Sequence, residues 1–223
     1  MMNGYSESEF LCYLVDNELK PGERLPSLSD LSQEIGISIG KLREQLEVAR
    51  TFGFVSVQPR LGTRREAFDF YPAVHTSLIF GLTAGEASFE QFSQLRQTIE
   101  ASMWSVAVKL LTPEDKDQLD TIVAAAWQKL RGQPVHIPNG EHRQLHLSIF
   151  SRLANPFVQA LLTAYWDAYE LSELTRFADY QYWLDVWSYH ERIVLSIRND
   201  EYSKGQQLLV DHFQLLPTVT LPK

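Results

Sequence analysis

The 223-residue sequence contains a single cysteine, Cys12, so it cannot form an internal disulfide bond or a Cys-x-x-C zinc site. No apolar run approaches the roughly 18 residues that a membrane-spanning helix needs. The first ten residues have neither the basic start nor the apolar stretch of a signal peptide. We therefore expect a protein that resides in the cytoplasm, where the environment is reducing, and that does not bind a membrane.

The sequence also lacks an excess of positive charge. Its formal net charge is −8, which argues against nucleic-acid binding over the whole surface. The exception is the segment 38–65, which has six basic residues and two acidic ones: Lys41, Arg43, Arg50, Arg60, Arg64 and Arg65, with Glu44 and Glu47. This segment is a candidate DNA face. Judged by charge alone, a solvated helix with Lys/Arg–Glu pairs fits it equally well.

The hydrophobic content of 44% supports a sizeable core, and the length fits two small domains. The N-terminal part predicts three helices followed by two strands around the turn PRLG: residues 5–18, 27–36 and 38–52, then FVSVQ and TRREAF. Ser27 and Ser38 are placed to cap the second and third helices. This order predicts a winged helix-turn-helix over residues 1–67, whose third helix can enter the major groove.

The string LKPGERLPSLSDLSQEIGISIGKLREQLEVARTFGFVSVQPRLGT resembles the winged-helix signature of the GntR family. The resemblance rests on PG, LP, the G-I-S turn, L-R-E-x-L and the wing glycine. It implies DNA contacts from the start of the third helix and from the wing: Ser38, Lys41, Arg43, Arg60, Gly62 and Thr63. For Arg43, an ion pair with a neighbouring glutamate is the alternative. Ser29 and Ile39 stand where many members carry arginine, so an operator cannot be transferred from relatives.

The rest of the chain predicts an all-helical bundle, which makes the fold mainly α. The expected helices are 70–82, 87–111, 113–131, 140–153, 155–177, 180–199 and 201–216, and the domain covers residues 70–218. The segment 165–189 contains nine aromatic residues: Tyr165, Trp166, Tyr169, Phe177, Tyr180, Tyr182, Trp183, Trp187 and Tyr189. Core and dimer packing explains them, with cavity lining as the alternative.

Four histidines of this bundle are expected to point inward. His142 and His146 lie one helical turn apart, and His190 and His212 each share a face with aliphatic residues. A buried imidazole is readily satisfied by a local carbonyl or carboxylate, but facing helices of a bundle can also assemble a metal site. The pattern alone leaves both interpretations open.

Three strings are similar to the FCD domain, the helical effector module of the FadR-type branch of GntR regulators: SFEQFSQLRQTIEASMWSVAVKLLTPEDKDQL, EHRQLHLSIFSRLANPF and HERIVLSIRNDEYSKGQQLLVDH. In many members an aspartate and three histidines bind a divalent metal beneath a cavity for a small carboxylate. The resemblance implies a metal set of His142, His146, His190 and His212, with His142 at the aspartate position. Four imidazoles suit Zn²⁺ first, and Ni²⁺ or Cu²⁺ next, rather than Mg²⁺, Ca²⁺ or Mn²⁺.

The resemblance further assigns Arg96 and Asn155 to the effector, although Arg96 can instead pair with Glu100 at i+4. Without a carboxylate ligand the metal keeps its full charge, which favours an anionic effector. The expected function is a homodimeric DNA-binding regulator, in the family usually a repressor, that binds an operator in double-stranded DNA. The rival interpretations are a hydrolytic zinc enzyme using the histidine cluster, and a DNA-binding dimer with a purely structural metal.

Overall fold

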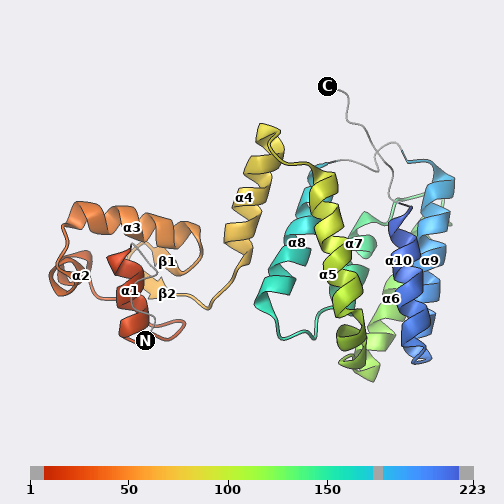
Figure 1. The fold of residues 1–223 in the computed structure, drawn as a ribbon, viewed down its shortest axis with the longest axis horizontal. Helices are drawn as coiled ribbons and strands as arrows, with labels where there is room; N and C mark the ends of the chain where they lie inside the picture. Colours follow the sequence, from red (N-terminus) through yellow and green to blue (C-terminus); the bar gives the residue numbers. More distant parts are fainter. Residues whose placement is uncertain (1–7, 173–177, 216–223) are drawn as a thin grey trace. The chain divides into compact units, whose positions relative to one another are not determined.

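The computed structural model describes residues 8–172 and 178–215. The chain divides into two compact units, Met1–Ser77 and Leu78–Lys223. Within the described ranges there are ten helices and one two-stranded antiparallel sheet (Figure 1). None of these helices combines the length and the apolar character needed to cross a bilayer. The mainly α architecture expected from the sequence is confirmed.

The first unit has the expected winged helix-turn-helix order. Its elements are α1 (Glu9–Asp16), α2 (Leu28–Ile35), α3 (Ile39–Thr51), β1 (Val55–Gln58) and β2 (Gly62–Arg65). The Ser27 side chain accepts a hydrogen bond from the Asp30 amide and caps α2, and Ser38 caps α3 in the same way. Gly36 ends α2 with φ +77°, a left-handed conformation that glycine adopts at no steric cost.

The core of this unit joins the three helices to the sheet. Its buried side chains are Phe10, Leu14, Leu25, Leu31, Leu42, Leu46, Ala49 and Val55. α3 contributes Leu42, Leu46 and Ala49 to this core, and its polar face is left for solvent or a partner.

The second unit is a helical bundle, preceded by a helix that crosses the boundary between the units. That helix is α4 (Tyr71–Ala84), and the bundle consists of α5 (Phe89–Lys109), α6 (Pro113–Leu130), α7 (Asn139–Ile149), α8 (Pro156–Leu171), α9 (Tyr180–Arg198) and α10 (Tyr202–Phe213). Capping boxes begin α5 at Ser88 and α6 at Thr112. α8 and α10 end at Leu171 and Phe213, before the expected ends at 177 and 216, and those two positions, like Phe177, lie outside the described residues.

The early end of α7 has a cause in the sequence that follows it. The sequence pattern predicts a helix over 140–153, whereas α7 ends at Ile149 and a turn follows it. Asn155 precedes Pro156, which disfavours a helical conformation at Asn155, and the Asn155 side chain accepts from the Phe157 and Val158 amides to begin α8. The chain must therefore leave α7 before this new start. Leu153 stays buried in the core although it is not helical.

Helix packing brings the histidine-bearing helices together. α9 packs against both α10 and α6, while α7 packs against α6 and α8 (Figure 1). α10 also approaches α5 closely, because a Cβ at Gly205 would lie 2.7 Å from the Trp104 ring. The Trp104 indole donates to the Tyr202 carbonyl at 2.8 Å and fixes this contact.

Candidate metal centre

The four inward histidines come from three helices and meet inside the bundle. α7 supplies His142 and His146, α9 supplies His190, and α10 supplies His212. Their side chains are buried, with exposed fractions of 1–3%. One ring nitrogen from each lies within 4.8 Å of those of the other three. The structure therefore brings together all four residues that the sequence suggested as a metal set.

The separations within the cluster resemble those between ligands of one ion. The Nε2 atom of His190 lies 3.2 Å from the Nε2 atom of His146 and 3.2 Å from that of His212. Nitrogens bound tetrahedrally to zinc at about 2.0–2.1 Å are separated by about 3.3–3.4 Å. His190 thus lies close to the ligand spacing of a tetrahedral site from both His146 and His212, and a ring nitrogen of His142 lies within 4.8 Å of theirs.

The hydrogen bonding of the rings also fits a cation. Neither ring nitrogen of His142 has a hydrogen-bond partner among the described residues, and the same holds for the Nδ1 atoms of His190 and His212. Buried polar atoms without partners are costly, and most native buried groups avoid this state. Binding a metal would use one lone pair of each ring and remove part of this cost.

The protonation state of the histidines favours the same role. Burial lowers the pKa of all four imidazoles well below the ordinary value of 6.5. The nearby Arg96 guanidinium lowers the pKa of each further, and the facing imidazoles add to this effect at His142, His190 and His212. Metal binding requires the neutral ring, so the burial that disfavours charge also keeps these ligands ready at neutral pH.

These pKa shifts predict an acid-sensitive fold in the metal-free protein. Below about pH 6.5 the unfolded histidines gain protons while the buried ones stay neutral, so the free energy of unfolding falls as the pH falls. Between pH 6.5 and 5.5 each histidine that stays neutral contributes a loss of about 1 kcal/mol, and four contribute about 4 kcal/mol. Urea denaturation in the presence of a chelator measures this loss.

The matched variant for the pH experiment is His142→Phe, because aromatic rings surround this position. It should show a loss about 1 kcal/mol smaller than the wild-type protein over the same pH range. An identical pH dependence for the two proteins would contradict the inference that His142 stays neutral in the folded protein while it gains a proton in the unfolded one.

A buried ion pair lies next to His146. The Arg96 Nε atom is 2.9 Å from Glu100 Oε1, and the His146 Nδ1 atom is 3.3 Å from Glu100 Oε2. The Arg96 Nη2 atom also lies 2.9 Å from His146 Nδ1. The structure thus contains the Arg96–Glu100 pair that the sequence offered as an alternative to an effector contact. Burial raises the pKa of the Glu100 carboxyl, and the Arg96 guanidinium opposes that rise.

Aromatic rings enclose both the cluster and the ion pair. The Arg96 guanidinium carbon lies 4.8 Å from the Tyr165 ring centre, 5.5 Å from that of Trp166 and 5.0 Å from that of Phe213. His142 packs edge-on against several rings: Trp166, Tyr169, Trp183 and Trp187. Much of the aromatic segment therefore packs around the histidines, and these rings exclude water from the charges.

The contact of Glu100 with the histidine cluster is a feature of this site that the sequence does not predict. The i+4 spacing indicates Glu100 only as a partner of Arg96, and its approach to His146, which lies on another helix, has no signature in the sequence. Asn155, by contrast, lies at the start of α8, where its side-chain oxygen is used as the helix cap. Its amide NH₂ is the group that it could offer to an effector.

The residues expected to contact DNA lie on α3 and the hairpin. Ser38 caps α3, and Lys41 forms an ion pair with Glu9 of α1. Arg43 is exposed and forms no ion pair with any carboxylate in the described part of the chain. The wing tip contains three of the predicted residues: Arg60 with φ +66°, Gly62 with φ +83°, and Thr63.

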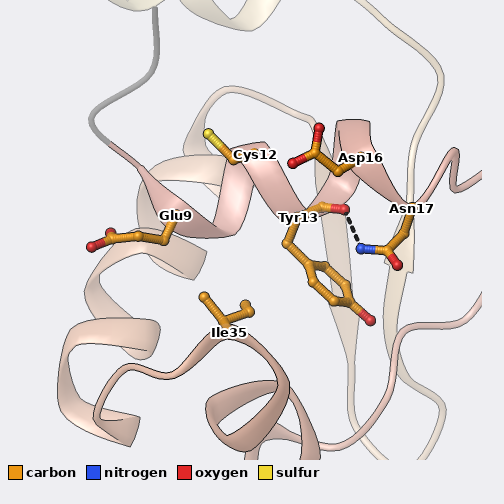
Figure 2. A pocket seen from close by; sticks show the side chains of 6 residues that line it. All are labelled: Glu9, Cys12, Tyr13, Asp16, Asn17 and Ile35. Atoms are coloured by element: carbon orange, nitrogen blue, oxygen red, sulfur yellow. Dashed lines mark hydrogen bonds between the residues drawn. The ribbon is translucent and has the colours of Figure 1, made fainter. Parts of the chain in front are cut away.

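A surface pocket of 290 Å³ opens on the first unit, outside both expected sites. It is lined by Glu9, Cys12, Tyr13, Asp16 and Asn17 of α1 and its cap, together with Ile35 of α2 (Figure 2). Asn17 donates to the Tyr13 carbonyl at 2.9 Å along one edge. With two carboxylates and no basic side chain among these lining residues, the pocket does not suit a phosphate or a carboxylate ligand.

Comparisons with known proteins agree with these two units. The FCD domain family matches residues 91–215, which is more than half of the chain. The HTH-type transcriptional regulator LutR of Bacillus subtilis is 25% identical over 104 residues, and the match spans 47% of each protein. The uncharacterized HTH-type transcriptional regulator YieP of Escherichia coli is 25% identical over 166 residues, which are 70% of this chain and 69% of YieP.

A solved structure supports the fold. The GntR protein of Streptococcus agalactiae has a TM-score of 0.65 and 16% identity, and the match covers 92% of this chain and 94% of that one. The family match includes α7, α9 and α10 and hence all four histidines of the cluster. The chain belongs to the FCD domain family.

Proposed function

We propose that this protein is a homodimeric, sequence-specific DNA-binding repressor, switched by a small carboxylate that binds beside a divalent metal in the helical unit. The observation that carries the proposal is the group of four buried imidazoles next to the Arg96 guanidinium. Family membership supports the regulatory role over a hydrolytic enzyme.

His142, His146, His190 and His212 would hold the metal. Nitrogen ligands in this number favour Zn²⁺, with Ni²⁺ and Cu²⁺ as the next candidates. A bound divalent ion supplies a Lewis acid that can accept a carboxylate oxygen. The aromatic rings around His142 and Arg96 keep water away, which strengthens the attraction between such a centre and an anion.

Charge supports a carboxylate effector. The Arg96–Glu100 pair has no net charge, so it leaves the charge of a bound divalent ion uncompensated. The Nη2 atom of Arg96 lies beside His146, whereas its Nε atom lies beside Glu100. The Arg96 guanidinium can therefore bind an effector oxygen at the metal while its Nε atom stays paired with Glu100. Asn155 would contribute through its amide NH₂.

The two roles of a metal give different results on chelation. The test is to remove the metal from the full chain and to follow folding by circular dichroism and DNA binding by fluorescence anisotropy. A sensory metal predicts a folded protein that binds DNA but no longer releases it when a carboxylate is added. Loss of folding would instead favour the alternative function, a DNA-binding dimer whose metal is purely structural.

For DNA, α3 and the wing are the proposed contacts: Ser38, Lys41, Arg43, Arg60, Gly62 and Thr63. Arg43 is the sharpest test because it is exposed and unpaired among the described residues. With an operator selected from random duplexes, Arg43→Ala is expected to weaken binding by about 1–3 kcal/mol and to relax sequence preference at one base pair. Fluorescence anisotropy with single-site operator variants measures both effects.

The control for this experiment is Arg198→Ala in the second unit, where Arg198 pairs with Asp117 and Asp120. It should bind like the wild type. Equal affinity and equal base preference in the Arg43→Ala and wild-type proteins would exclude Arg43 from base recognition.

A further inference from the structure

The loop between α1 and α2 is hydrogen-bonded to the outer edge of β2. The Leu25 amide donates to the Thr63 carbonyl at 2.9 Å, and the Arg65 amide donates to the Glu23 carbonyl at 2.9 Å. Arg24 forms an antiparallel bridge with Arg64 of β2. β2 therefore has paired neighbours on both sides, β1 and the loop segment around Arg24.

This pairing places Arg24 and Arg64 on the same face of the sheet. Residues directly opposite each other on neighbouring strands share a face, and Ser56 completes the row with Arg64. Leu25 and Val55 lie at alternate positions, and both are buried in the core of the first unit. The face with the two arginines is therefore the outer face of the wing.

The Arg24 side chain runs along the wing toward its tip. A Cβ at Gly62 would lie 3.0 Å from the Arg24 Nε atom and 3.3 Å from Nη2, so the guanidinium lies against the glycine backbone. Gly62 also has φ +83°, which a side chain would strain. The Arg64 Nη1 atom donates to the Gly22 carbonyl at 2.7 Å, which holds this second guanidinium beside the loop.

Neither guanidinium has a carboxylate within ion-pair distance among residues 8–172 and 178–215. The acidic residue that reaches this face, Glu66, is hydrogen-bonded to Ser56. Like charges directly opposite each other on neighbouring strands are destabilising. A bound anion would relieve the repulsion, and guanidinium groups match the geometry of phosphate oxygens.

We propose that Arg24 and Arg64 together bind a phosphate of the DNA backbone next to the wing tip; this inference rests on the proposed DNA binding. The two cations lie on the face of the sheet behind the tip, and contacts to phosphate position a protein without reading bases. Arg24 belongs to the loop before α2, and it thus links that loop to the DNA surface formed by the wing.

The test compares Arg24→Gln and Arg64→Gln with the wild type, using full-length protein and two duplexes of equal length, the selected operator and a shuffled sequence. Anisotropy titrations over a range of KCl concentrations give affinity and salt dependence. The double variant Arg24→Gln with Arg64→Gln should lower the slope of log affinity against log salt by about 0.9, the contribution of one phosphate, which is about an eightfold loss at 0.1 M relative to 1 M, and each single variant should show part of this loss. The loss should be the same for both duplexes.

The control is Arg131→Gln, an exposed arginine of the second unit, and thermal unfolding checks that each variant folds. Unchanged affinity and slope in both wing variants would overturn the phosphate site while leaving the proposed DNA binding intact. A loss confined to the selected operator would also overturn it, because it would indicate base recognition. If the wild type binds neither duplex, both this inference and the proposed function are wrong.

Discussion

Replacing Glu100 by leucine is expected to lower the free energy of unfolding of the metal-free protein by about 3–5 kcal/mol. Glu100 is fully buried and lies 2.9 Å from the Arg96 Nε atom. Removing the carboxylate leaves a buried guanidinium surrounded by aromatic rings without a compensating charge. Urea denaturation at neutral pH with a chelator measures the change.

Two further variants show whether the ion pair causes this loss. Glu201→Ala removes an exposed partner of Lys204 and should cost less than about 1 kcal/mol. The double variant Arg96→Met with Glu100→Leu should recover much of the stability, since it removes both buried charges together. A single Glu100→Leu variant as stable as Glu201→Ala would contradict the account of this pair.

The second large effect concerns the metal. Protein purified without a polyhistidine tag is expected to bind one Zn²⁺ per chain, and a free zinc concentration of 1,000 times Kd should raise the free energy of unfolding by about 4 kcal/mol. His190→Ala should abolish both effects, because His190 Nε2 lies 3.2 Å from the Nε2 atoms of His146 and His212. Elemental analysis and thermal unfolding measure them.

The control here is His136→Ala, which changes an exposed histidine in the loop before α7. It should keep the wild-type metal content and stabilisation. Metal bound equally by the His190→Ala and wild-type proteins would place the ion elsewhere.

Local features of the fold could be predicted from the sequence because their causes lie within a few residues. Ser27 and Ser38 begin helices where their side chains cap the next turn, and Gly36 ends the first of these two helices. The end of α7 was predicted wrongly because the apolar spacing continues to Leu153, whereas the Asn155-Pro156 start of α8 decides the backbone.

The candidate site was only partly predictable for a related reason. The spacing of His142 and His146 places both rings on one face of a helix, but spacing alone does not bring His190 and His212 to them; that expectation came from the family resemblance. The approach of Glu100 to His146 depends on how α5 and α7 pack. Arg24 likewise joins the wing through strand pairing over about forty residues of sequence, which periodicity does not reveal.

X-ray absorption at the zinc edge of the tag-free, zinc-loaded protein tests the central claim most directly. We expect a first shell dominated by imidazole nitrogens at about 2.0 Å, four from the protein. In the His142→Ala variant one of the four should be replaced by an oxygen. A shell made mainly of oxygens, or a spectrum that His142→Ala leaves unchanged, would contradict the four-histidine centre.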